Sequence, residues 1–105
     1  METLTVGDRQ VELDEDGHLA DYSEWSPEVA QALADRDGIG ELTEEHLAVL
    51  RTIRAYYDKF KVPPMAHILT RECGKSFREL HELFRKQPGK RAAKLAGLSK
   101  AQGCV

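Results

Sequence analysis

Apolar residues at the start of the chain alternate with polar residues, and later the apolar spacing becomes helical. Leu4 and Val6 are followed, after Gly7-Asp8-Arg9, by Val11 and Leu13. Alternation on both sides of a Gly-Asp turn predicts a short β-hairpin. The segment Asp14-Glu15-Asp16-Gly17 is expected to end it. Three larger residues should then lay the following loop against the body of the protein: Leu19, Tyr22 and Trp25.

Capping residues mark the next two helices. Ser26-Pro27-Glu28 supplies an N-cap, a proline at the first helical position and an acid in the first turn, and Gly38 is expected to end that helix. Thr43-Glu44-Glu45 opens the longest helix. Its apolar line predicts a face turned to the core, made of Leu47, Leu50, Ile53, Tyr57 and Phe60.

Prolines and a capping box divide the second half of the chain. Pro63-Pro64 breaks the long helix, and a new one restarts near Met65. Ser76 and Glu79 have the capping-box spacing, and a last helix is expected from Pro88 to Ala96, ended by Gly97. The fold class is therefore predicted to be mainly α, a compact helical bundle with a small N-terminal β-hairpin, formed by residues 1–97.

Residues 98–105 are predicted to form a mobile C-terminal arm that carries Cys104. Residues 98–102 have neither helical nor strand periodicity, and Gly103 leaves the backbone beside Cys104 free to turn. An extended arm could place the thiol roughly 26 Å from its anchor, at about 3.3 Å per residue. Such reach suits a group carrier that presents its thiol inside a partner's site. The alternative is a frayed terminus that happens to contain a cysteine.

Charge is divided unequally along the 105 residues, although the net charge is only −3. Residues 1–49 contain 14 acidic and 2 basic side chains, whereas residues 50–105 contain 4 acidic and 13 basic ones. No acidic side chain follows Glu82. The basic stretch suggests contact with an acidic partner surface or a phosphate backbone, and we predict that Lys90, Arg91, Lys94 and Lys100 dock a partner protein. A solvated helix face is the alternative.

Other chemistry has little support in the sequence. The histidines and Cys73 are scattered without metal-ligand spacing, and no glycine-rich phosphate loop occurs, so we expect neither a metal nor a cofactor. Cys73 is expected to be a structural, partly buried cysteine. Two cysteines without a disulfide framework, no signal peptide and no membrane span predict a cytoplasmic protein, which we expect to be monomeric.

The C-terminal block resembles the DsrC/TusE family of sulfur-relay proteins. The matching residues are Leu80, Leu83-Phe84, Pro88, Lys90, Ala92, Lys94, Ala96-Gly97-Leu98, Lys100 and Gly103-Cys104-Val105. The resemblance extends to Asp14-x-Asp16-Gly17-x-Leu19, Trp25, Glu41-Leu42-Thr43-Glu44-Glu45-His46, Arg54-x-Tyr56-Tyr57 and Pro64-x-x-x-Ile68-Leu69-Thr70. It implies a sulfurtransferase that acts as a relay component rather than a stand-alone catalyst. Cys104 would carry sulfur as a persulfide between a donor and an acceptor protein.

The position eleven residues before Cys104 separates branches of that family. Two-cysteine members, which serve dissimilatory sulfite reductase, have a second cysteine there, whereas this chain has Ala93. A single arm cysteine resembles the TusE branch, which passes sulfur toward 2-thiouridine of tRNA. One alternative is a carrier associated with sulfur oxidation or sulfite reductase. Another is a helix-turn-helix regulator that uses the helix pair at 43–72, although we expect nucleic-acid contact to be weak or indirect.

Overall fold

The chain forms the predicted hairpin followed by a series of crossing helices. The computed structural model describes residues 2–98. Its elements are β1 (Glu2–Val6), β2 (Arg9–Leu13), the short 3-10 helix η1 (Tyr22–Glu24), α1 (Pro27–Asp37), α2 (Glu44–Phe60), α3 (Ala66–Cys73), α4 (Phe77–Phe84) and α5 (Pro88–Leu95). The predicted fold class is confirmed, and each expected helix is present with boundaries close to those predicted.

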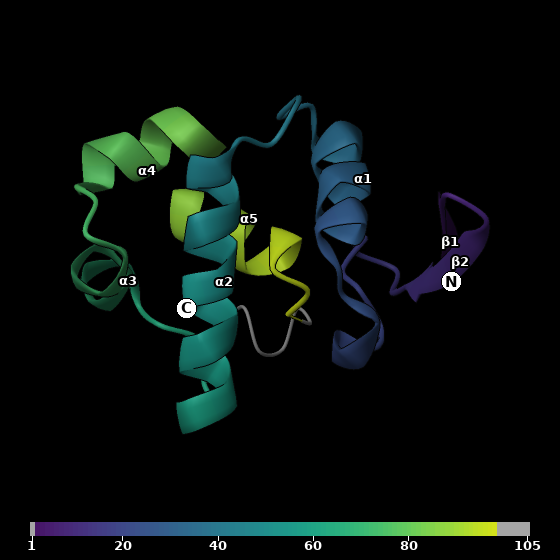
Figure 1. Ribbon diagram of the computed structural model, residues 1–105, viewed down its shortest axis with the longest axis horizontal. Helices are drawn as coiled ribbons and strands as arrows, with labels where there is room; N and C mark the ends of the chain where they lie inside the picture. The colour runs from purple at the N-terminus through teal and green to yellow at the C-terminus, as the bar shows by residue number, and fades with distance from the viewer. Residues whose placement is uncertain (1, 99–105) are drawn as a thin grey trace.

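The hairpin lies at one end of the molecule, against α1. Its strands pair antiparallel with Leu4 opposite Val11, and both side chains are buried. Gly7 has a φ of 63°, which suits the first central position of a tight two-residue turn. Figure 1 shows the hairpin beyond α1, on the side away from α3 and α4.

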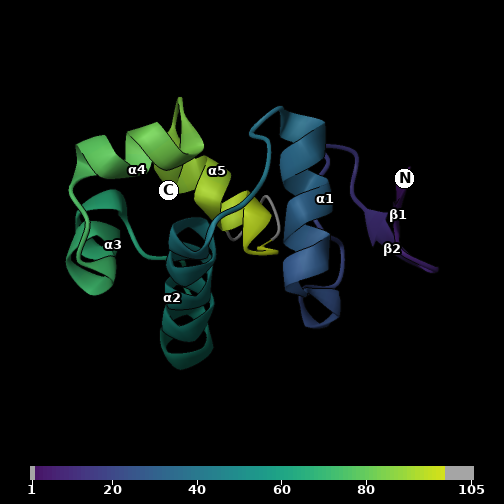
Figure 2. The ribbon, with the colours of Figure 1, turned by 45° about the horizontal axis from the view of Figure 1, so that its top comes forward.

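The last helix, α5, holds the bundle together. It packs against α1, α2 and α4, while α3 packs against both α2 and α4. Figure 2 shows α5 passing between α1 on one side and α4 on the other, with α2 alongside. None of the helices in residues 2–98 has both the length and the hydropathy that crossing a lipid bilayer requires.

The predicted apolar face of α2 is only partly correct. Leu50 and Ile53 are buried, but Leu47 is half-buried and Phe60 is 51% exposed. The buried stripe also includes His46 and Val49, so it is rotated from the predicted line. Phe60 is exposed because the end of α2 extends beyond the other helices (Figures 1 and 2).

His46 completes the capping box of α2 in place of the usual glutamate. The Thr43 N–H donates to His46 Nδ1 at 3.0 Å, so the ring proton lies on Nε2. Nε2 then donates to the Leu83 carbonyl at 2.9 Å, which ties the start of α2 to α4. This histidine is therefore a satisfied structural residue.

Leu98 belongs to the helical body rather than to the arm that the sequence predicted to begin there. Its side chain is fully buried, and its N–H donates to the Ala93 carbonyl at 3.1 Å. Gly97, with a φ of 89°, donates to the Lys94 carbonyl at 3.0 Å. The two bonds form a Schellman motif that ends α5. The body of the protein therefore extends one residue further than expected.

Candidate functional site

The predicted sulfur-carrying residue Cys104 and the predicted docking residue Lys100 lie outside the described residues. The structure instead describes the place from which residues 99–105 continue, the C-terminal end of α5. We call this place the arm junction and define it by His18, Trp25, Arg54, Gly97 and Leu98. Its geometry decides how rigidly the chain leading to Cys104 is attached.

Gly97 lies in direct contact with two side chains of the arm junction. A Cβ atom at this position would be 2.8 Å from Trp25 Cδ1 and 3.0 Å from an Arg54 guanidinium nitrogen. Real Cβ atoms essentially never come within 2.8 Å of another heavy atom, the 3.0 Å contact is also tight, and the φ of 89° is strained for any other residue. Glycine is therefore required here both for the turn and for the close approach.

The guanidinium of Arg54 is held between two aromatic rings. Its carbon lies 3.8 Å from the centroid of the Tyr22 ring and 4.6 Å from that of the Trp25 ring. It donates to the Ala96 carbonyl at 2.8 Å and to the Tyr22 carbonyl at 3.2 Å. Burial lowers the pKa of the guanidinium, against the opposing effects of Tyr22 and Asp58. The side chain thus joins α2, the η1 loop and the last turn of α5.

Two further bonds attach the end of α5 to the loop between β2 and α1. Trp25 Nε1 donates to the Leu95 carbonyl at 2.7 Å. His18 Nδ1 lies 3.2 Å from the Leu98 carbonyl, within hydrogen-bond distance. The carbonyls of Leu95 and Ala96, which the end of a helix leaves without intrahelical donors, are therefore bound by the side chains of Trp25 and Arg54, and the Leu98 carbonyl beyond them lies beside His18. The chain leading to Cys104 starts from a fixed point.

Tyr22, whose ring contacts the Arg54 guanidinium, is itself held in place by Asp58 and Tyr57. Its hydroxyl donates to Asp58 Oδ1 at 2.8 Å, and its ring packs against Tyr57 at a centroid distance of 5.0 Å. Burial, together with the hydrogen bond to Asp58, raises the pKa of Tyr22 to about 12. The hydroxyl therefore stays protonated, and keeps this bond, throughout the neutral range.

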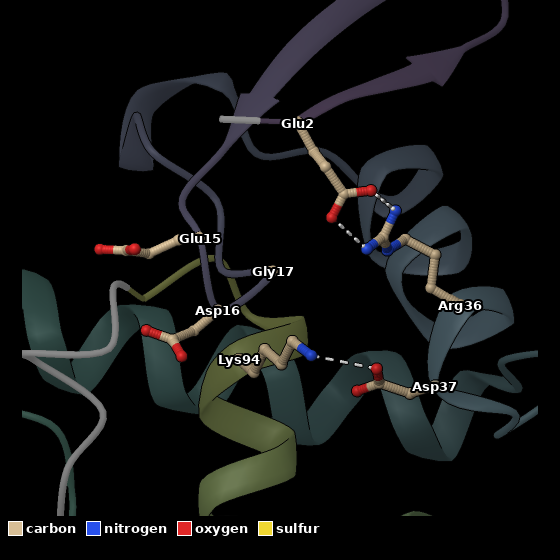
Figure 3. Close-up of a pocket in the computed structure, with 7 residues that line it drawn as sticks. All are labelled: Glu2, Glu15, Asp16, Gly17, Arg36, Asp37 and Lys94. Atoms are coloured by element: carbon tan, nitrogen blue, oxygen red, sulfur yellow. Dashed lines mark hydrogen bonds and ion pairs between the residues drawn. The ribbon is translucent and has the colours of Figure 1, made fainter.

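The predicted docking residues within residues 2–98 differ in their surroundings. Lys90 is exposed, whereas Arg91 is half-buried and approaches the Asp37 carbonyl at 3.5 Å. Lys94 Nζ forms an ion pair with Asp37 Oδ1 at 3.0 Å, and these two side chains are only 20% and 17% exposed. In Figure 3 this ion pair lies below a second ion pair, which Arg36 forms with Glu2. Lys94 thus joins α5 to α1, and the docking role of all four bases stays a prediction.

Reversing the charge of Lys94 is expected to destabilise the protein, unlike the same change at Lys90. Lys94→Glu would place a second carboxylate beside Asp37 in a half-buried site, which we expect to cost about 2 kcal/mol. Lys90→Glu should change the free energy of unfolding by less than about 0.5 kcal/mol. Urea unfolding measures both, and Asp37→Lys should restore part of the loss in Lys94→Glu. Equal stability of Lys94→Glu and Lys90→Glu would contradict the structural role.

Cys73 lies at the end of α3, where it is half-buried and packs against the hydrophobic core, as expected. Within residues 2–98, no cluster of three or more potential ligands is arranged to hold a metal ion. The contacts of the arm junction are packing contacts and hydrogen bonds between the end of α5 and the rest of the fold.

The fold and the arm junction define a small α-helical domain with an N-terminal hairpin. Residues 5–105 match the family described as "DsrC like protein", so the match includes Cys104. The chain belongs to this family.

Similar proteins include members with two different names. The dissimilatory-type sulfite reductase subunit gamma of Nitratidesulfovibrio vulgaris is 36% identical over 105 residues and is covered, like this chain, in full. The sulfurtransferase TusE of Salmonella choleraesuis is 36% identical, with 92% of this chain and 94% of the relative covered. The crystal structure of the oxidized gamma subunit (DsrC) from Archaeoglobus fulgidus has a TM-score of 0.86 and 38% identity, over 99% and 100% of the two chains.

Proposed function

We propose that this protein is a sulfur carrier that holds persulfide sulfur on Cys104 and passes it to a partner protein. The observation that supports this most strongly is that the family match runs through the C-terminal segment to residue 105. Relatives named sulfurtransferase TusE, which match over 92% of this chain, support the same chemistry. The clamped arm junction fits this role, because it anchors the base of a segment that must enter another protein's site.

The proposed reaction is a thiol exchange at a sulfane sulfur. The Cys104 thiolate attacks the outer sulfur of a donor persulfide, a new S–S bond forms on Cys104, and the donor leaves as a thiol. Transfer to an acceptor thiolate repeats the exchange and returns Cys104 to the thiol state. No net oxidant or reductant is required. A free thiol has a pKa of about 8.5, so only a few per cent is thiolate near neutrality, and the partner's site is expected to activate it.

Ala93 favours the single-thiol form of this chemistry. Two-cysteine members have a second thiol at this position, whereas this chain has an alanine, which lies buried within α5. We infer that no intramolecular disulfide forms at the usual place, and that sulfur leaves by intermolecular transfer. This assignment favours the branch that supplies tRNA 2-thiouridine synthesis over carriers associated with sulfite reductase.

Intact mass spectrometry after incubation with a persulfide donor tests the proposal. The protein is expected to gain the mass of one sulfur atom, the gain should be reversed by a thiol reductant, and Cys104→Ser should abolish it. The matched control is Cys73→Ser, which should retain the gain because Cys73 packs against the core. Retained loading in Cys104→Ser together with lost loading in Cys73→Ser would show that the assignment is wrong.

A further inference from the structure

Two adjoining hollows are lined by residues of α3, the start of α4 and the start of α5. The helices α3 and α4 lie at the end of the molecule opposite the hairpin (Figure 1). One hollow, of about 350 Å³, is lined by Met65, Phe77 and Pro88. The other, of about 580 Å³, continues from it, because both are lined by His67 and Phe77. We call the two together the α3–α5 groove.

Exposed apolar side chains form part of the lining of the α3–α5 groove, which we call its floor. Met65 is 54% exposed and Phe77 is 52% exposed. Within residues 2–98, the large apolar side chains classed as exposed all fall between Phe60 and Phe77. Apolar side chains gathered at a concave surface are typical of a protein interaction site.

The charged side chains that line the groove are all basic, although the carboxylate of Glu79 lies nearby and accepts from the Ser76 N–H at 2.9 Å. Arg71 and Lys75 line one hollow and Lys90 lines the other, whereas no aspartate or glutamate lines either hollow within the described residues. Lys75 has a carboxylate nearby, Glu45, but at 3.9 Å. In addition, α3 and α5 both begin at this groove without a capping side chain or an acid in the first turn, so their N-terminal ends add to the positive potential. The third helix that begins here, α4, is capped by Ser76 and has Glu79 in its first turn.

We propose that the α3–α5 groove docks a segment of a partner protein that carries apolar side chains flanked by carboxylates. The apolar side chains would cover Met65 and Phe77, and the carboxylates would lie beside Arg71 and Lys90. The inference rests on the proposed function, because a sulfur carrier must dock on its donor and its acceptor. It assigns that docking to a surface separate from the arm junction.

Two other occupants fit these observations less well. The acidic N-terminal half of a second copy would match the charge, but no large apolar side chain in residues 2–49 is exposed to fill the floor. A nucleic acid would also match the charge, but its affinity would come mainly from phosphate contacts, which would leave the apolar side chains of Met65 and Phe77 uncovered.

A titration followed by amide chemical shifts tests the groove directly. The probe is a synthetic amphipathic peptide of leucine and glutamate, added to the isotopically labelled Cys104→Ser protein. We expect the shifts to concentrate at Ala66, Phe77 and Gly89. Arg71→Glu combined with Lys90→Glu should weaken binding by about tenfold. Phe77→Ala should weaken it by a similar factor.

Matched controls separate the groove from general charge and hydrophobicity. Arg51→Glu changes an exposed base on α2, and Phe60→Ala removes an aromatic side chain as exposed as Phe77 but outside the groove. Both should leave the affinity within about twofold of the parent. Equal losses in these controls would overturn the proposal, as would equal binding of the peptide with lysine in place of glutamate.

The remaining outcomes identify the other occupants and also overturn the proposal. A short DNA duplex that shifts the same amides without dependence on Phe77 would indicate a nucleic-acid surface. Concentration-dependent shifts without peptide would indicate self-association. Because the test protein lacks Cys104, peptide binding does not depend on sulfur loading. If the protein bound the peptide but its Cys104 gained no sulfur, the proposed carrier function would be refuted and the docking groove would stand. If Cys104 gained sulfur but the peptide did not bind, only the docking groove would be refuted.

Discussion

Replacing Gly97 with alanine is expected to lower the free energy of unfolding by about 3 kcal/mol. Two costs add at this position. The backbone of the alanine would have to adopt a φ of 89°, and its Cβ atom would lie 2.8 Å from Trp25 Cδ1. Trp25 cannot move away without straining its bond to the Leu95 carbonyl. Chemical denaturation followed by the fluorescence of Trp25, the single tryptophan, measures the loss where it arises.

Alanine substitutions at two other glycines distinguish the cost of the positive φ from the cost of the close contact. Gly38 ends α1 with a φ of 75° but has open space around its Cβ direction, so Gly38→Ala should cost only about 1 kcal/mol. Gly89 lies in α5 with open space and no positive φ, so Gly89→Ala should be neutral or stabilising by up to about 1 kcal/mol. If Gly97→Ala cost no more than Gly38→Ala, the close packing at the arm junction would not hold in solution.

Local signals in the sequence predicted the elements of the fold well. Caps and prolines are short-range features, so Ser26-Pro27 and the Ser76–Glu79 capping box determine helix starts almost independently of the rest of the chain. The face that a helix buries depends instead on its neighbours. Phe60 fits the apolar line of α2 but is exposed, since α2 extends beyond the helices that would cover it.

The arm junction could be predicted only in part, because it is built by contacts between distant residues. The sequence indicated that Gly97 ends α5, but Arg54 contacts Ala96 from 42 positions away. Likewise, the sequence grouped Lys94 with Lys90 by charge, and only the packing of α5 on α1 pairs Lys94 with Asp37. A partly buried arginine between two aromatic residues leaves no pattern at helical or strand spacing. The resemblance included Trp25 and Arg54 without indicating their contact.

Removing the guanidinium of Arg54 is the other change with a large expected effect. Arg54→Ala leaves the carbonyls of Ala96 and Tyr22 without their donor and removes the cation from between the rings of Tyr22 and Trp25. Hydrogen bonds from a charged donor contribute about 1.5–3 kcal/mol, and cation–π contacts add about 0.5–2 kcal/mol. We expect a loss of about 3 kcal/mol in the free energy of unfolding, and a shift of Trp25 emission to longer wavelength in the folded protein.

Two further variants show whether geometry or charge is responsible. Arg54→Lys keeps the charge but cannot donate in a fork to two carbonyls, so we expect it to recover less than half of the loss. Arg51→Ala removes an exposed arginine on the same helix and should cost less than about 0.5 kcal/mol. If the arm junction also positions the C-terminal segment, Arg54→Lys should slow sulfur transfer to a protein acceptor, under conditions in which it remains folded. Its alkylation rate at Cys104 should stay that of the parent, because the thiol itself is unchanged. Full stability and full transfer in Arg54→Lys would mean that charge alone suffices at the junction.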